Sequence, residues 1–505
     1  MEGYNSDSNY TIGHFKELNP EYLNMCAVLA GVEPVPIEDS FSYCELGCGY
    51  GLSTLINAAN YPQGTFYALD YNPSQIAYAK KMAKDAGLNN IHFIEASFQD
   101  VVDDPTLLPK FDFILFHGIY AWVSEENRAN LVKISGNHIN SGGMVYNSYN
   151  AKPGWANIEI IQKLMHGLSQ EYIGSSSDKI DSLINHVDKI TNMNDGFIQN
   201  QSKELKRHIE QIKSKNKTYV AHEYINDGWR AFYFPEVSQE MQKAKLDYLC
   251  LALLSENISK QLQTDSLNNT LKDVKSIENR ELIKDISLNT KFRRDIYTRG
   301  DYGELTKEGQ YNWFKNIRWI SLVSKKVKKY NFSFISSSGE TPREPFDTIL
   351  ASLKQNNMTT IELQKISNSG NDKIIDALVL LYNDGFIAPY KRANRQAQKL
   401  NSVIANKAFD KLKITKICYP HANIGYPISM VSLLWLNAIN AGFGNSKEMI
   451  EYVHNLFKQN RQELNIKGKH LRGEELKKYL VIQEKEWRTH ILPIWINVGV
   501  VDIKK

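Results

Sequence analysis

The stretch that decides the fold of this chain reads Cys44-Glu-Leu-Gly-Cys-Gly-Tyr-Gly51. It follows the apolar segment that begins at Phe41, and it precedes Leu52–Asn60, which has the residue pattern of a helix. The three glycines allow a tight turn and a close approach of the backbone to a ligand. A glycine-rich turn between a strand and a helix is typical of a doubly wound α/β fold.

The sequence around this turn, from about residue 40 to 150, alternates between strand and helix patterns. This alternation predicts a parallel sheet in a Rossmann-like α/β domain, with its ligand crevice at the carboxyl ends of the strands. Gly87 provides the C-terminal cap of the second predicted helix. We predict strands over Phe41–Leu46, Thr65–Asp70, Ile91–Glu95, Phe111–His117 and Gly143–Tyr149, and helices over Leu52–Asn60 and Pro73–Ala86.

Three details of the glycine turn favour one cofactor over others. Glu45 lies at the end of the first strand, where it could hold the cationic amino group of a methionine moiety but would repel a pyrophosphate. Leu52 takes the place of the third glycine of the dinucleotide fingerprint. Asp70 ends the next strand, where a carboxylate accepts hydrogen bonds from both ribose hydroxyls. Together they favour S-adenosylmethionine over a nicotinamide or flavin dinucleotide, and over a structural turn without a cofactor.

The third strand is followed by Ala96-Ser-Phe98, at the position expected for the adenine. The hydroxyl or the backbone amide of Ser97 could meet the edge of the base. Phe98 offers a stacking face, although ordinary core packing is an equally good interpretation.

The methyl acceptor is indicated by aromatic residues after the fourth and fifth strands. These strands continue into Phe116-His-Gly-Ile-Tyr-Ala-Trp122 and Tyr146-Asn-Ser-Tyr149, without the Pro-Pro dipeptide typical of enzymes that methylate base amino groups. An aromatic pocket suits a lysine, whose neutral form costs about 4 to 5 kcal/mol at pH 7, because desolvation lowers the pKa of the amine. Cation–π attraction also tolerates the methylated ammonium. The candidate catalytic residues are His117, Tyr120, Trp122 and Tyr149, with His117 either accepting a proton or contacting the cofactor.

The chain of 505 residues is too long for one compact core. Beyond the core we predict two strands, Thr218–Tyr224 and Arg230–Pro235, an amphipathic helix over Ser238–Glu256, and a winged-helix-like unit. The helices of that unit are predicted over Phe346–Gln355, Thr360–Ser367 and Asp372–Asp384. The predicted divisions are a methyltransferase core over 1–157, a helical insertion with possible dimer contacts over 158–217, closing strands and a connecting helix over 218–289, and a mostly α-helical substrate-docking region over 290–505.

Composition excludes several classes of protein. The net charge of +4 is too mild for a typical nucleic-acid binder. No apolar run approaches the roughly 20 residues needed to cross a bilayer, and the first ten residues lack the features of a secretory signal. The five cysteines are scattered and complete no metal site. We therefore expect a cytoplasmic protein without a metal, without membrane insertion and without a nucleic-acid partner.

Several stretches of the sequence resemble one family. Tyr43–Gly51, Phe116–Trp122 and Tyr146-Asn-Ser-Tyr-Asn-Ala-Lys-Pro-Gly-Trp155 resemble the bacterial methyltransferases that carry a methyltransferase regulatory domain. Within that group the chain is most similar to the rickettsial protein-lysine methyltransferases that act on outer membrane protein B. The resemblance continues into Ala221-His-Glu-Tyr-Ile225 and Ala231–Val237, and more loosely through Cys418-Tyr-Pro-His-Ala422.

This resemblance implies a cytoplasmic, dimeric enzyme that uses S-adenosylmethionine to methylate many lysines of a large surface protein. It also implies that an N-terminal segment containing Tyr10 closes over the cofactor. Relatives often read Thr-His-Pro where this chain has Leu18-Asn-Pro20, which puts any histidine contact there in doubt. A methyltransferase for a small molecule or nucleic acid, and an inactive scaffold, are the alternatives. The predicted cofactor residues are Tyr10, Glu45, Gly47, Cys48, Gly49, Asp70, Tyr71, Ala96, Ser97, Phe98 and His117.

Overall fold

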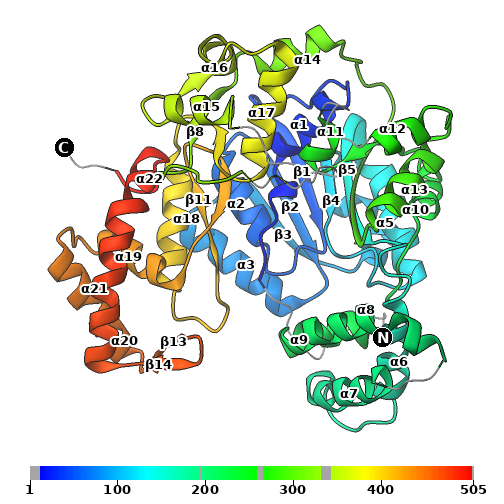
Figure 1. The fold of residues 1–505 in the computed structure, drawn as a ribbon, viewed down its shortest axis with the longest axis horizontal. Coiled ribbons are helices and arrows are strands. Elements are labelled where there is room, and N and C mark those ends of the chain that lie inside the picture. Colours follow the sequence, from blue (N-terminus) through cyan, green and yellow to red (C-terminus); the bar gives the residue numbers. More distant parts are fainter. Residues whose placement is uncertain (1–11, 193–195, 259–264, 331, 333–342, 503–505) are drawn as a thin grey trace.

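A seven-stranded sheet forms the centre of the computed structural model, which describes residues 12–192, 196–258, 265–330, 332 and 343–502 (Figure 1). The strand order is β3-β2-β1-β4-β5-β7-β6. Strands β1 to β5 are parallel, whereas β7 is antiparallel to both of its neighbours. The Rossmann-like prediction is confirmed. The strands are β1 (Phe41–Leu46), β2 (Gly64–Asp70), β3 (Ile91–Glu95), β4 (Phe111–Phe116), β5 (Ile139–Asn150), β6 (Asp247–Leu251) and β7 (Phe292–Thr298).

Helices cover both faces of this sheet. Side chains of β4 alternate between two apolar cores, with Phe113 and Leu115 on one face and Ile114 and Phe116 on the other. The strand order reverses between β1 and β4, which opens a ligand crevice at their carboxyl ends. The first face packs on α1 (Pro20–Leu29), α2 (Leu52–Asn60) and α3 (Pro73–Ala86), and the second on α4 (Phe98–Asp103), α5 (Glu125–His138) and α10 (Phe234–Gln242).

The insertion after β5 is helical, as predicted, and has an apolar core of its own (Figure 1). Its helices are α6 (Glu159–Ser169), α7 (Ser176–Thr191), α8 (Gly196–Lys213) and α9 (Lys217–Tyr224). The predicted strand Thr218–Tyr224 is therefore wrong. Val220, Ala221 and Tyr224 are buried together against the insertion core, and this spacing is that of a helix.

The last two strands of the sheet differ from those predicted. Of the predicted strand Arg230–Pro235, the structure retains a single bridge between Phe232 and Ala151, because α10 begins at Phe234 with a proline in its first turn. The predicted helix Ser238–Glu256 is wrong in its second half, which contains β6. The closing strands are β6 and β7, so the sheet extends into the region predicted for substrate docking. The connecting helices are α11 (Leu254–Asn257), α12 (Asp265–Leu271) and α13 (Ile277–Leu288).

The C-terminal half contains the three helices of the winged-helix prediction. These are α15 (Phe346–Leu353), α16 (Thr360–Ser367) and α17 (Asn371–Asn383), beside a small sheet of β8 (Arg318–Ser321), β9 (Met358–Thr359) and β10 (Ile387–Pro389). The other elements are α14 (Lys307–Phe314), α18 (Arg395–Asn406), β11 (Lys416–Tyr419), β12 (Ile424–Pro427), α19 (Met430–Asn440), α20 (Ser446–Gln459), β13 (Leu464–Ile466), β14 (Lys469–Leu471), α21 (Gly473–His490) and α22 (Leu492–Asn497).

This half shares one continuous apolar core with the sheet domain. Helix α18 packs directly against α2 and α3, and α17 packs against α11. The described residues of this half are consequently an integral part of the fold, not a module that can be removed without exposing apolar surface. Among the described residues, no helix is both long enough and apolar enough to cross a membrane.

Candidate active site

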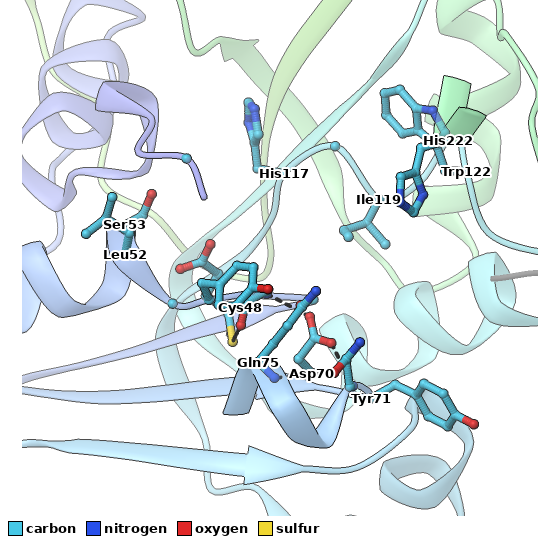
Figure 2. Close-up of a pocket in the computed structure, with 18 of the residues that line it drawn as sticks. Cys48, Leu52, Ser53, Asp70, Tyr71, Gln75, His117, Ile119, Trp122 and His222 are labelled. Carbon is cyan, nitrogen blue, oxygen red and sulfur yellow. Dashed lines mark hydrogen bonds between the residues drawn. The ribbon is translucent and has the colours of Figure 1, made fainter. Parts of the chain in front are cut away.

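A cavity of about 300 Å³ lies at the carboxyl ends of β1, β2 and β4 (Figure 2). This volume is at the lower end of the range for small-molecule sites. The glycine turn, the loop after β4, the N-terminal segment and α9 all contribute to its wall. The lining residues are Gly13, Phe15, Glu45, Gly47, Cys48, Gly49, Tyr50, Gly51, Leu52, Ser53, Asp70, Tyr71, Asn72, Pro73, Gln75, His117, Gly118, Ile119, Trp122, Tyr219, His222, Glu223 and Asn226.

The glycine turn has room only for glycine at its two ends. Gly47 has φ +72°, and a Cβ there would lie 2.6 Å from Cδ1 of Ile119. Gly51 has φ +67°, and a Cβ there would lie 2.5 Å from Cε1 of Phe93. The N–H groups of Gly47 and Cys48 both donate to the carbonyl oxygen of Leu69, at 2.8 and 3.0 Å. The turn is thereby fixed to the end of β2, with its backbone facing the cavity.

Two carboxylates of the predicted cofactor site, Glu45 and Asp70, line the cavity beside the glycine turn. Glu45 accepts a hydrogen bond from the hydroxyl of Thr54, and burial raises the pKa of Glu45 to about 7. Asp70 accepts from the backbone N–H of Gly49 at 2.7 Å and from that of Asn72 at 2.9 Å. Burial also raises the pKa of Asp70. Both side chains can receive a donor or a cation, which fits the amino group and the ribose of S-adenosylmethionine.

His117 lies at the end of β4 and is a poor proton acceptor. Its Nδ1 is 2.8 Å from the hydroxyl of Tyr146 and 3.2 Å from that of Ser148, while its ring lies 3.7 Å from the ring of Phe15. Burial, together with the positive charge of Arg294, lowers the pKa of His117 to about 3. The imidazole is therefore neutral, and its position suits a contact with the cofactor better than proton transfer.

The opposite end of the cavity is formed by Trp122 and by the helix α9. Figure 2 shows Trp122 and His222 together, away from Leu52 and Ser53. Glu223 is 3% exposed and accepts three hydrogen bonds from neutral N–H groups. Their donors are Nε1 of Trp122 (3.0 Å), Nδ2 of Asn150 (2.8 Å) and Nε1 of Trp229 (3.1 Å). Burial raises the pKa of Glu223 to about 7.

Two predicted catalytic residues do not line the cavity. Tyr149 is fully buried within β5, where its hydroxyl donates to Asp295 at 2.6 Å. Tyr120 is buried beside it, with its ring 5.4 Å from the ring of Phe232. Strand β5 continues to Asn150, so the ring of Tyr149 enters the core on one face of the sheet.

The residues predicted to meet the adenine do not line the cavity either. Ser97 caps α4, where its hydroxyl and backbone N–H both donate to Asp100. Phe98 packs in the core, and Ala96 packs against it. Tyr10 lies outside the described residues. Within the described residues, no cluster of three or more His, Cys, Asp or Glu side chains could bind a metal.

Sequence reasoning missed several lining residues. The predicted site residues do not include Phe15, Gln75, Ile119, the α9 residues Tyr219, His222 and Glu223, or Asn226, which follows α9. A signal for His222 and Glu223 is present in the run from Ala221 to Ile225, which carries the family resemblance and overlaps the predicted strand Thr218–Tyr224. In a strand, the adjacent side chains of His222 and Glu223 would point to opposite faces of the sheet.

Known proteins are similar to this chain in sequence and in fold. The family described as "Methyltransferase domain" matches residues 44–143, and the family described as "Predicted methyltransferase regulatory domain" matches residues 216–299. The uncharacterized protein sll1526 of Synechocystis is 33% identical over 86% of this chain and 87% of its own length. The uncharacterized protein RP789 of Rickettsia prowazekii is 26% identical over 78% of this chain and 68% of its own length. The structure of PKMT2 from Rickettsia typhi in complex with AdoHcy has a TM-score of 0.70 at 20% identity, covering 97% of this chain and 99% of that one.

Proposed function

The chain belongs to the S-adenosylmethionine-dependent methyltransferases that carry a methyltransferase regulatory domain, and we propose that it methylates lysine side chains of a protein. The substrate class that fits best is a large bacterial surface protein such as outer membrane protein B. We also propose that the enzyme is cytoplasmic and works as a homodimer. The shared fold with PKMT2 of Rickettsia typhi, whose structure is in complex with AdoHcy, supports the proposal.

The residues of the glycine turn position the cofactor. S-adenosylmethionine supplies an activated methyl group on a sulfonium, and in-line transfer needs little more than alignment and exclusion of water. Glu45 binds the amino group of the methionine moiety, Asp70 accepts hydrogen bonds from the ribose hydroxyls, and Gly47 leaves the turn open to the ligand. His117, held by Tyr146, contacts the cofactor from the end of β4.

The charge of the cavity wall is the observation that carries the choice of acceptor. Among the described lining residues there are three carboxylates, Glu45, Asp70 and Glu223, and neither a lysine nor an arginine. Such a wall attracts a cationic amine and repels a phosphate backbone. The indole of Trp122 adds an aromatic face for an ammonium before and after methylation. A nucleic-acid acceptor, which binds through Lys and Arg contacts to phosphates, fits this wall poorly.

A direct transfer assay tests the proposal. The purified protein is incubated with labelled S-adenosylmethionine and, separately, with fragments of a lysine-rich surface protein, with a tRNA pool and with cell metabolites. We expect acid-stable label in the protein, located on lysine side chains by mass spectrometry. Label in tRNA or in a small metabolite, with none in the protein, would establish one of the alternative acceptors instead.

A further inference from the structure

The buried carboxylates of this protein divide into two groups. Nine Asp and Glu side chains are buried among the described residues. Six of them form ion pairs with Arg or Lys, and these are Glu17, Glu21, Glu281, Asp285, Asp295 and Glu484. For the other three, Glu45, Asp70 and Glu223, no ion pair is found within the described part of the chain, and all three line the cavity.

A buried carboxylate without a cation is unfavourable unless a ligand supplies the missing charge. Desolvation costs several kcal/mol per ion, and neutral hydrogen bonds offset only part of it. For Glu45 and Asp70, the two carboxylates beside the glycine turn, the cofactor is that ligand. Glu223 lies at the other end, on α9, so the cofactor loop does not account for its charge.

The surroundings of Glu223 are those of a preformed site for a cation. Two indole N–H groups and one amide N–H fix the carboxylate from three separate segments, namely the loop after β4, the end of β5 and the segment after α9. Asn150 and Trp229 donate to Oε1 of Glu223, and Trp122 donates to Oε2. All three donors are neutral, so they orient the carboxylate without supplying a positive charge to balance it.

On this basis we propose that Glu223 is the anionic subsite that binds the ammonium group of the incoming lysine. The inference rests on the proposed function, because it names the residue that recognises the acceptor. Trp122 and Trp229 act as positioning residues that orient the carboxylate. Glu223 is thus the residue of the cavity that selects a cationic amine over a neutral alkyl side chain.

The test compares two small probes that differ in charge. Nα-acetyl-lysine methylamide and Nα-acetyl-norleucine methylamide are titrated into protein saturated with AdoHcy, and binding is followed by ligand-observed NMR. We expect the wild type to prefer the lysine probe by about tenfold or more, the effect of a hydrogen bond to a charged group. Glu223→Gln should lose this preference and keep its affinity for AdoHcy. Equal binding of the two probes by the wild type overturns the inference, as does a preference retained in Glu223→Gln.

Glu484→Gln is the matched control, because it removes a buried carboxylate of α21 that pairs with Arg488 far along the chain. It should keep the preference for the lysine probe, and an equal loss in both variants overturns the inference. If Glu223→Gln fails to bind AdoHcy, Glu223→Asp replaces it. Glu223→Asp keeps the charge one methylene further back, so the lysine probe should bind more weakly while still binding better than norleucine. A norleucine probe bound as tightly as lysine by that variant overturns the inference.

These binding measurements do not require turnover, so they separate the inference from the proposed function. A wild type that prefers the lysine probe but methylates no protein lysine contradicts the proposed function and leaves the subsite in place. A wild type that methylates protein lysine, with the same KM and kcat in Glu223→Gln, contradicts the subsite and leaves the proposed function in place.

Discussion

Cofactor affinity should depend on pH through Glu45. Burial raises the pKa of this carboxyl to about 7 in the free protein, so much of the population is protonated at mildly acidic pH. Binding the cationic amino group requires the ionised form, and the bound cation in turn lowers the pKa. Cofactor binding therefore releases a proton from Glu45, and affinity rises with pH.

The size of the effect follows from the titration of a single group. With a pKa of about 7, the ionised fraction of Glu45 rises from about a tenth at pH 6 to about three quarters at pH 7.5. The dissociation constant for AdoHcy should accordingly fall by about eightfold over this interval. Above pH 7.5 Glu45 is already mostly ionised, so little further change in affinity is expected there.

Calorimetric titration of AdoHcy at several pH values measures this dependence. Glu45→Gln should bind AdoHcy more weakly and show a nearly flat profile over the same interval. Glu223→Gln is the control, since burial also raises the pKa of Glu223 to about 7, yet Glu223 lies at the other end of the cavity and should leave the slope unchanged. A slope that persists in Glu45→Gln, or that disappears in Glu223→Gln, refutes the assignment of the titrating group.

Three further substitutions test the site. Asp70→Ala should weaken AdoHcy binding by about 2 kcal/mol, or about 30-fold, in a protein that remains folded, and unchanged affinity would contradict the ribose contact. Gly47→Ala should weaken cofactor binding because its Cβ meets Ile119, whereas Gly87→Ala, with a similar φ of +66° and open space, should change stability alone. Trp122→Ala should raise the pH at which lysine is methylated efficiently, because the amine would then sit in a wetter site. An unshifted pH–rate profile in a folded variant would rule out this desolvation.

The cofactor end of the site could be predicted because local sequence determines it. Helices Leu52–Asn60 and Pro73–Ala86 have the predicted bounds, and Gly87 provides the predicted left-handed cap. Glycines, capping residues and apolar alternation act within a few residues of one another. Glu45 and Asp70 follow from strand ends, and the structure places both on the cavity.

The acceptor end could not be predicted in the same way, because contacts far apart in the sequence determine it. Helix α9 has only eight residues, and its conformation depends on packing against an insertion core formed by α6, α7 and α8. Strand β6 lies at the edge of the sheet and is stabilised by pairing with β7, which follows some 45 residues further along the chain. Tertiary contacts of this kind override local propensity in short segments.

The position of a strand end decides which aromatic residue can reach the cofactor. The prediction ended the fifth strand at Tyr149, whereas β5 continues to Asn150. Successive side chains of a strand point to opposite faces. Tyr146 and Ser148 therefore lie on the face of His117 and contact its Nδ1, while Tyr149 points into the other core toward Asp295. Asn150, the last residue of this strand, donates a hydrogen bond from its Nδ2 to Glu223, so the end of β5 also fixes the carboxylate at the cavity wall.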